Sequence, residues 1–212
     1  MTPYDPQRHH RRSIRLPGYD YTQPGAYFIT IVTHERAHWF GRVIDGNMEL
    51  NPFGEIAREE WFKTAVVRPY VRLDERDFVV MPNHVHGIIW ITDDNVGARD
   101  VGAQRRCAPT MTMTMPNVVP GSIGAIIRAF KSAAAKRINI LRDTPGAPIW
   151  QRNYYEHSIR NDDAWRRIAE YIITNPQRWV LDRENPDRAG VDEFDTWFDN
   201  QGDAPCRPNE VK

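Results

Sequence analysis

Two histidines separated by one residue have the residue types and spacing best suited to chemistry. His84 and His86 lie in the stretch MPNHVHGIIW, residues 81–90. Alternate side chains of a β-strand point the same way, so a strand here presents both imidazoles on one face, as half of a metal site. Gly87 leaves room for another group to approach the strand closely. Two ordinary histidines on the surface or rim of a sheet explain the same spacing, so further ligands have to be found.

Candidates for those ligands lie in a later amphipathic stretch, residues 164–174, and just after it. Tyr171 and Asn175 are four residues apart and therefore share one face of a helix. A phenol can act as a nucleophile, and an amide oxygen can bind a hard cation. A tyrosine that packs the helix on a sheet, and an asparagine that ends the helix before Pro176, explain both residues without chemistry.

Three more candidates occur in the aromatic-rich stretch Ile149–Arg160, where we expect a strand. Tyr154 and Tyr155 are rival nucleophiles, with packing of the core as the alternative role. Tyr155 and His157 fall on one face of the predicted strand. His157 is either a residue that orients the site or an ordinary strand histidine.

The order of the predicted elements indicates the fold that positions these residues. Strands are expected at Ala26–Thr33, Val71–Met81, Val85–Thr92 and Ile149–Arg160, a hairpin over Arg42–Leu50, and helices from Asn51 to about Arg68, from Ser122 through Ile138, and over Ala164–Thr174. Strand pairs interleaved with helices predict an α+β fold, a ferredoxin-like antiparallel sheet with helices packed on one face.

Composition and charge divide the chain into three parts. We expect a basic arm over residues 1–25, a folded domain over 26–179 that contains a mobile excursion at 93–121, and an acidic tail over 180–212. The 212 residues carry no net charge, but the tail holds nine acidic and four basic residues, which leaves 24 basic against 19 acidic residues before it. That surplus permits a polyanionic partner such as a nucleic acid.

Basic side chains that could contact phosphates occur in three places. They are Arg11, Arg12 and Arg15 in the arm, Arg105 and Arg106 in the excursion, and Arg128, Lys131, Lys136 and Arg137 on the predicted helix. A solvated helix face explains the last four as well.

Neither the cysteines nor the hydropathy indicate secretion or a membrane. Cys107 and Cys206 lie far apart in hydrophilic stretches, which disfavours a disulfide framework. No apolar run approaches the roughly 18 residues of a membrane-spanning helix, and the first 15 residues are polar and basic. We therefore expect a cytoplasmic protein with no membrane partner.

Five segments, in their joint order and spacing, resemble the single-tyrosine HUH transposases, specifically the bacterial REP-associated tyrosine transposases. They are LPGYDYTQPGAYFITIVTHERAHWFG, MPNHVHGIIW, SIGAIIRAFKSAAAKRIN, IWQRNYYEHSIRN and IAEYIITNPQRW, and they cover about Arg12 to Trp179. The resemblance implies a ferredoxin-like sheet, metal ligands at His84, His86 and Asn175, and a nucleophile at Tyr171. Some branches of the family carry glutamine where Asn175 stands.

The resemblance also implies a reaction and a substrate. A transposase of this type cleaves and rejoins single-stranded hairpin DNA through a 5′-phosphotyrosine intermediate. Two imidazoles and an amide oxygen suit Mg²⁺ or Mn²⁺ as the divalent metal. The expected partner is single-stranded or hairpin DNA, and the expected state is a monomer or a homodimer that associates with the nucleoid when it is bound to DNA.

Two other functions fit the same fold. A catalytically silent module would bind palindromic DNA or RNA without cutting it, although competent residues at all four proposed positions favour the enzyme. A replication or conjugation initiator would use the same chemistry, but such proteins usually carry further domains.

Overall fold

A five-stranded antiparallel sheet forms the centre of the computed structural model, which describes residues 22–93 and 119–200. The strands are β1 (Gly25–Val32), β4 (Val71–Arg72), β5 (Phe78–Met81), β6 (His84–Ile91) and β7 (Tyr155–Ile159). β6 pairs with β1 on one side and with both β4 and β5 on the other, and β7 pairs with the far side of β1. The α+β class and the ferredoxin-like order are thereby confirmed.

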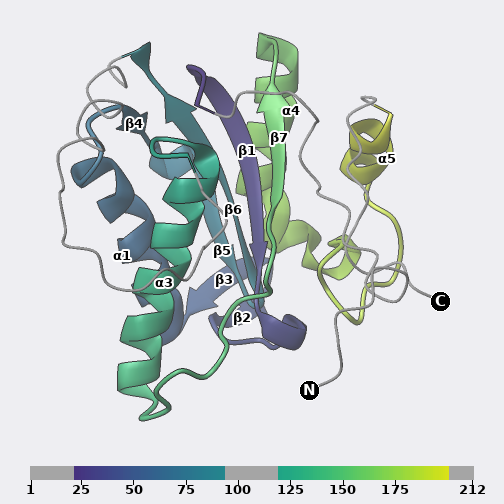
Figure 1. Ribbon diagram of the computed structural model, residues 1–212. Coiled ribbons are helices and arrows are strands. Elements are labelled where there is room, and N and C mark those ends of the chain that lie inside the picture. Colours follow the sequence, from purple (N-terminus) through teal and green to yellow (C-terminus); the bar gives the residue numbers. More distant parts are fainter. Residues whose placement is uncertain (1–21, 94–118, 201–212) are drawn as a thin grey trace, which may run out of the picture.

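Helices cover both faces of this sheet (Figure 1). α1 (Pro52–Val66) and α3 (Ile123–Leu141) pack on one face against a core that includes Tyr27 and Ile29 of β1. α4 (Asp162–Thr174) packs on the opposite face, where it meets Phe28 of the same strand. The expectation of helices on one face therefore holds for α1 and α3 and is wrong for α4, because β1 is apolar on both of its faces.

Capping side chains explain where the helices begin. Asn51 Oδ1 accepts hydrogen bonds from the N–H groups of Phe53 and Gly54 at the start of α1. Asn161 Oδ1 accepts one from Ala164 N–H at 2.8 Å, so Asn161 caps α4, which begins two residues before the predicted start at Ala164. These contacts satisfy backbone donors that have no partner within the helix.

Turn chemistry divides or shortens two of the predicted elements. The predicted strand Val71–Met81 is interrupted between β4 and β5 by a short 3₁₀ helix, Glu75–Asp77, which Asp74 caps through a 2.9 Å bond from Arg76 N–H. In the predicted strand Ile149–Arg160 only β7 is regular.

The predicted hairpin is confirmed. It consists of β2 (Gly41–Ile44) and β3 (Asn47–Leu50), joined at Asp45 and Gly46. Both joining residues have positive φ angles, 48° and 75°, as a two-residue hairpin turn requires.

The chain beyond α4 folds back onto the sheet. A 3₁₀ segment (Asn175–Leu181) continues from α4, and α5 (Glu193–Asp199) follows. Phe194 and Phe198 of α5 join the same buried cluster as α4 and Phe28. A large part of the predicted acidic tail thus packs on the α4 face of the sheet.

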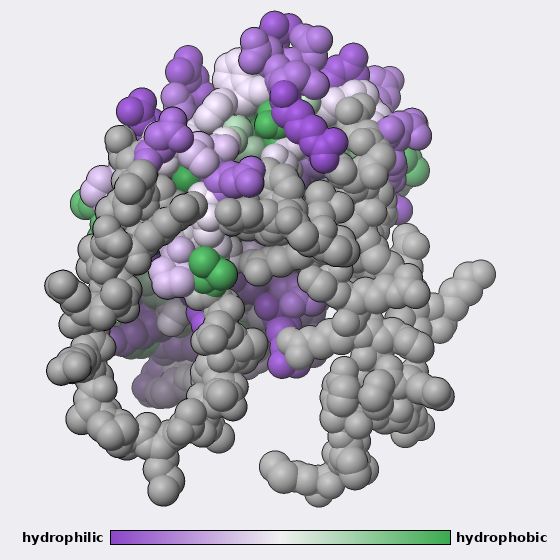
Figure 2. All heavy atoms as spheres, turned by 45° about the horizontal axis from the view of Figure 1, so that its top comes forward, coloured by the Kyte–Doolittle hydropathy of each residue, from purple (hydrophilic) through white to green (hydrophobic). Residues whose placement is uncertain are grey.

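The molecular surface that Figure 2 presents is mostly hydrophilic where it is coloured, with only scattered apolar side chains. None of the helices within residues 22–93 and 119–200 has the length and apolarity needed to cross a bilayer.

Candidate active site

The two histidines of β6 form a close pair. His84 and His86 both point to the α4 face of the sheet, and their Nε2 atoms lie 2.9 Å apart. Their exposed fractions are 0% and 3%, so the pair is shielded from solvent.

Each imidazole has a partner on its other nitrogen. Asn83 Oδ1 lies 2.8 Å from His84 Nδ1, and Thr30 Oγ1, on the neighbouring strand β1, lies 2.8 Å from His86 Nδ1. Such partners hold a ring in one orientation, as the partners of metal-binding histidines commonly do. Both Nε2 atoms are thus directed toward the same point.

Two residues of the opposing helix lie near this histidine pair: Tyr171 within α4, and Asn175 at the C-terminal end of α4. Tyr171 Oη lies 3.4 Å from His86 Nε2, and the two rings are 5.1 Å apart. Asn175 is fully buried and keeps helical backbone angles, which places it one turn beyond Tyr171 on the same face. The structure therefore brings together the four residues that the sequence analysis singled out.

A fifth residue, Asp182, lies at the centre of the site and was missed from the sequence. Its Oδ2 accepts hydrogen bonds from Tyr171 Oη at 3.1 Å and from Asn175 Nδ2 at 2.7 Å. The same oxygen lies 3.8 Å from Nε2 of both His84 and His86. Asp182 is one of nine acidic residues in its region, and no motif or spacing distinguishes it from the others.

These residues fit a divalent metal ion. His84, His86 and Asp182 are buried, and their ligand atoms all lie within 4.8 Å of one another. The buried Oδ1 of Asn175 has no hydrogen-bond partner, a costly arrangement that a cation would relieve. Two imidazoles with carboxylate and amide oxygens are a donor set that suits Mn²⁺ or Mg²⁺. The group could therefore bind a metal ion.

Burial and charge determine the protonation of the site. Burial lowers the pKa of His84 to about 3, which leaves its imidazole neutral at neutral pH. Burial alone would raise the pKa of Asp182, but the two histidines and the Asn175 amide lower it far below its usual value. Burial, followed by the charge of Asp182, raises the pKa of Tyr171 well above that of a free phenol. Tyr171 is therefore a protonated phenol that donates to an ionised carboxylate.

The α5 helix covers the candidate nucleophile. The ring of Phe194 stacks on that of Tyr171 at 3.8 Å with an interplanar angle of 8°, and Tyr171 is only 4% exposed. An ion pair between Arg183 and Asp195, 2.9 Å apart, helps to hold α5 in place. The phenol is thus buried from both sides in this arrangement.

The remaining aromatic candidates lie in β7 or immediately before it. Tyr155 and His157 share the α4 face, as expected, and both contact Phe198, with ring separations of 5.6 and 4.9 Å. Tyr154 donates a 2.8 Å hydrogen bond to Glu156, which points to the other face of the sheet. None of these contacts joins them to the histidine pair, so their proposed roles in the site stay predictions.

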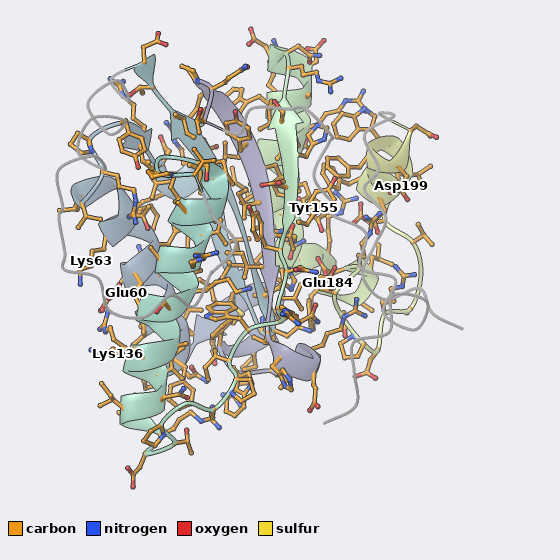
Figure 3. All side chains as sticks on the ribbon, in the orientation of Figure 1. Glu60, Lys63, Lys136, Tyr155, Glu184 and Asp199 are labelled. Carbon is orange, nitrogen blue, oxygen red and sulfur yellow. The ribbon has the colours of Figure 1, made fainter. Side chains whose placement is uncertain are left out.

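The sheet separates the basic residues of α3 from this site. Figure 3 shows Lys136 on the side of α1 and α3, whereas Glu184 lies on the side of α5. Lys131 donates to the carbonyl oxygen of Asn153 at 3.1 Å, and Arg137 pairs with Glu60 at 2.9 Å. Two of the predicted phosphate contacts are therefore engaged within the protein.

The other basic residues are either exposed or not described. Arg128 and Lys136 are exposed on α3. The predicted contacts Arg11, Arg12, Arg15, Arg105 and Arg106 lie outside the described residues.

Comparison with known proteins finds one close relative in sequence. The chain is 38% identical over 182 residues to an uncharacterized protein of Haemophilus influenzae, an alignment that covers 86% of this chain and 97% of the relative. No protein-family model matches the chain.

Two solved structures have a similar arrangement. One is a REP-associated tyrosine transposase bound to a REP hairpin, with a TM-score of 0.48 and 20% identity, covering 84% of this chain and 74% of the other. The second, a transposase candidate from Deinococcus radiodurans R1, has a TM-score of 0.39 and 16% identity, covering 74% of this chain and 94% of the other.

Proposed function

The chain belongs to the same family as the Haemophilus influenzae protein, and from its own residues we propose that it is a metal-dependent tyrosine transposase of the REP-associated type. It cleaves and rejoins single-stranded hairpin DNA through a 5′-phosphotyrosine intermediate. One observation carries the proposal: the phenol of Tyr171 lies 3.4 Å from His86 and 3.1 Å from Asp182, at a buried group that could hold a metal ion.

The proposed site uses four side chains to bind a divalent cation. His84, His86, Asp182 and the Asn175 oxygen hold the cation. A bound divalent cation supplies polarisation of the scissile phosphate and stabilises the negative charge that develops on its oxygens. Asn175 would offer the cation its Oδ1, the atom that has no hydrogen-bond partner in this structure.

The covalent step exchanges one phosphate ester for another. Tyr171 Oη forms a bond to phosphorus, the bond from phosphorus to the 3′ oxygen breaks, and the phenolic proton ends on that 3′ oxygen. Asp182, which already accepts the hydrogen bond of the phenol at 3.1 Å, is placed to guide that proton. Attack by a 3′-hydroxyl on the phosphotyrosine reverses the step, so DNA is rejoined without another energy source.

The burial of Tyr171 favours a second function, a catalytically silent module that binds palindromic DNA or RNA. A phenol beneath Phe194 with a raised pKa is neither accessible nor activated in this arrangement. The two functions differ in whether the chain ever forms a covalent bond to DNA.

Incubation of the full chain with labelled single-stranded hairpin oligonucleotides, taken from palindromes flanking its own gene, distinguishes them. The proposed transposase gives a protein–DNA adduct on a denaturing gel that requires Mn²⁺ or Mg²⁺. Tyr171→Phe abolishes the adduct, whereas the matched variant Tyr155→Phe, on the same face of the sheet, retains it. Tight hairpin binding without an adduct under either metal would instead establish the binding module.

A further inference from the structure

The orientation of the Asn83 side chain is set by three hydrogen bonds. Asn83 lies in the turn between β5 and β6 and is fully buried. Its Nδ2 donates to the carbonyl oxygens of Glu184 at 2.8 Å and of Arg36 at 3.2 Å. Rotating the amide by half a turn would place Oδ1 against two other oxygens, so only one orientation satisfies its neighbours.

This orientation determines which nitrogen of His84 carries the proton. Asn83 Oδ1, an acceptor only, faces His84 Nδ1 at 2.8 Å, so Nδ1 must be the donor. In a neutral imidazole the other nitrogen is then a bare lone pair. His84 Nε2 therefore points into the site without a proton.

The short distance between the two histidines then fixes the tautomer of His86. Their Nε2 atoms lie 2.9 Å apart, a hydrogen-bond distance that needs one proton between them. Because His84 Nε2 has none, His86 Nε2 carries it and donates. With one proton on the ring of His86, Nδ1 is then an acceptor, and the hydroxyl of Thr30, 2.8 Å away, donates to it.

We propose that Asn83 and Thr30 are positioning residues that hold His84 and His86 in opposite tautomers in the metal-free protein, so that only His86 relocates its ring proton when a cation binds. The second of these claims, the relocation of the His86 proton, rests on the proposed function, in which the site binds a metal ion. A cation between the two rings requires both Nε2 atoms to be bare. His84 already meets this condition.

The chemistry of the two partners explains the asymmetry. A hydroxyl can donate or accept, so Thr30 can reverse its hydrogen bond and accept from Nδ1–H of His86 after the proton has moved. A primary amide cannot exchange the roles of its oxygen and nitrogen in place, and Asn83 is held by two carbonyl groups. The tautomer of His84 is thus the same with and without a cation, whereas that of His86 changes.

Nitrogen NMR of the full chain with ¹⁵N-labelled histidine tests the proposal directly. In EDTA at neutral pH we expect a protonated Nδ1 on His84 and a protonated Nε2 on His86. Titration with Mg²⁺, which is diamagnetic, moves the proton of His86 to Nδ1 and leaves His84 unchanged. The same tautomer on both rings in EDTA, or a change at His84 alone, would overturn the proposal, and neither result needs a variant.

Variants separate a positioning role from a structural one. Thr30→Val keeps the shape of the side chain and removes the hydroxyl, and we expect its Kd for Mn²⁺ to rise about tenfold or more, with Thr30→Ser restoring it. Thr33→Val is the matched control, because it loses a buried 2.8 Å hydrogen bond to the Ala37 carbonyl on the same stretch of chain without touching a histidine. Equal Mn²⁺ affinity of Thr30→Val and Thr33→Val would contradict the assignment of Thr30.

The same experiments keep this inference distinct from the proposed function. Asn83→Leu removes the acceptor at nearly the same size, and we expect His84 to lose its Nδ1 proton preference in EDTA. If Mg²⁺ and Mn²⁺ bind nowhere in the wild-type chain, the metal function and the relocation of the His86 proton both fail. The opposite tautomers in EDTA would then still support the positioning roles of Asn83 and Thr30.

Discussion

At the scale of single residues, the site combines the neutral imidazole of His84 with the ionised carboxylate of Asp182 in an environment shielded from solvent. The pair of histidines could be predicted because a spacing of two in a strand places both rings on one face. Helical spacing placed Tyr171 and Asn175 on one face, but their roles in the site were expected only from the resemblance to the HUH transposases. Asp182 could not be predicted, because its contact with His84 and His86 depends on how the chain folds back after α4 and on no local pattern.

Because His84 is buried and held neutral, we expect the protein to lose stability in mild acid. The pKa of His84 is about 3 in the folded protein, against about 6.5 for a solvated histidine, so the unfolded chain binds more protons below pH 6.5. The free energy of unfolding therefore falls as the pH is lowered from 6.5 toward 3, by roughly 1 kcal/mol between pH 7.5 and 5.5 from this residue alone.

Urea denaturation at both pH values measures this effect. We expect His84→Gln to remove most of the difference while lowering stability at pH 7.5. An unchanged dependence on pH in His84→Gln would show that the imidazole is not held neutral.

Of the two proposed oxygen ligands, Asp182 and Asn175, we expect substitution of Asp182 to weaken metal binding more. Asp182→Asn keeps the size and removes the charge, and we expect the Kd for Mn²⁺, followed by electron paramagnetic resonance, to rise more than tenfold because hard cations favour carboxylates. Asn175→Ala should weaken binding less, since it removes a neutral ligand. Asp187→Asn, an exposed residue of the same segment, serves as the control and should bind as the wild type does.

At the scale of elements, β6 is constrained on both of its faces. The histidines occupy one face, while Gly87 on the other lies against the ring of Trp61. The sequence analysis expected a close approach at Gly87, and the structure shows that a side chain of α1 makes it. The glycine thus allows α1 to pack tightly beneath the strand that carries the site.

Gly87→Ala should destabilise the protein by about 1–3 kcal/mol through overpacking. A Cβ atom there would lie 2.4 Å from Cζ2 of Trp61 and 3.0 Å from Phe78, and both rings are held in the core. Urea denaturation measures the loss, with Val66→Ala, at an 81% exposed position, expected to change stability by less than about 0.5 kcal/mol. Equal effects of the two variants would contradict the tight packing.

Most elements were predictable because their signals are local. Helical periodicity located α3 and α4, and the Asp45-Gly46 turn located the hairpin of β2 and β3. The side of the sheet on which α4 packs was not predictable in the same way, because β1 is apolar on both faces and either would accept an amphipathic helix.

At the scale of the whole molecule, the C-terminal part of the described chain packs over the proposed nucleophile, Tyr171. The sheet separates an ordinary two-helix core from a second layer in which α4, the 3₁₀ segment and α5 surround Tyr171. Any DNA phosphate that reaches Tyr171 Oη must displace part of that layer, because the phenol is 4% exposed.

Phe194→Ala is therefore expected to raise the rate of adduct formation severalfold in the hairpin assay, while lowering overall stability. The substitution removes the ring that stacks on Tyr171 at 3.8 Å and leaves the metal ligands in place. Val191→Ala, at a 66% exposed position before α5, should react at the wild-type rate. A slower reaction of Phe194→Ala than of Val191→Ala would mean that the stacking ring supports catalysis.

The position of Asp182 and Tyr171 along the chain has a consequence during synthesis on the ribosome. The histidine pair leaves the ribosome first, and every strand of the sheet precedes the nucleophile and its carboxylate neighbour. A nascent or truncated chain that ends before Tyr171 contains every strand and the histidine pair but lacks the proposed nucleophile. Under the proposed function, only translation past Asp182 completes a chain able to cut DNA, so interrupted synthesis yields products that cannot form the phosphotyrosine bond.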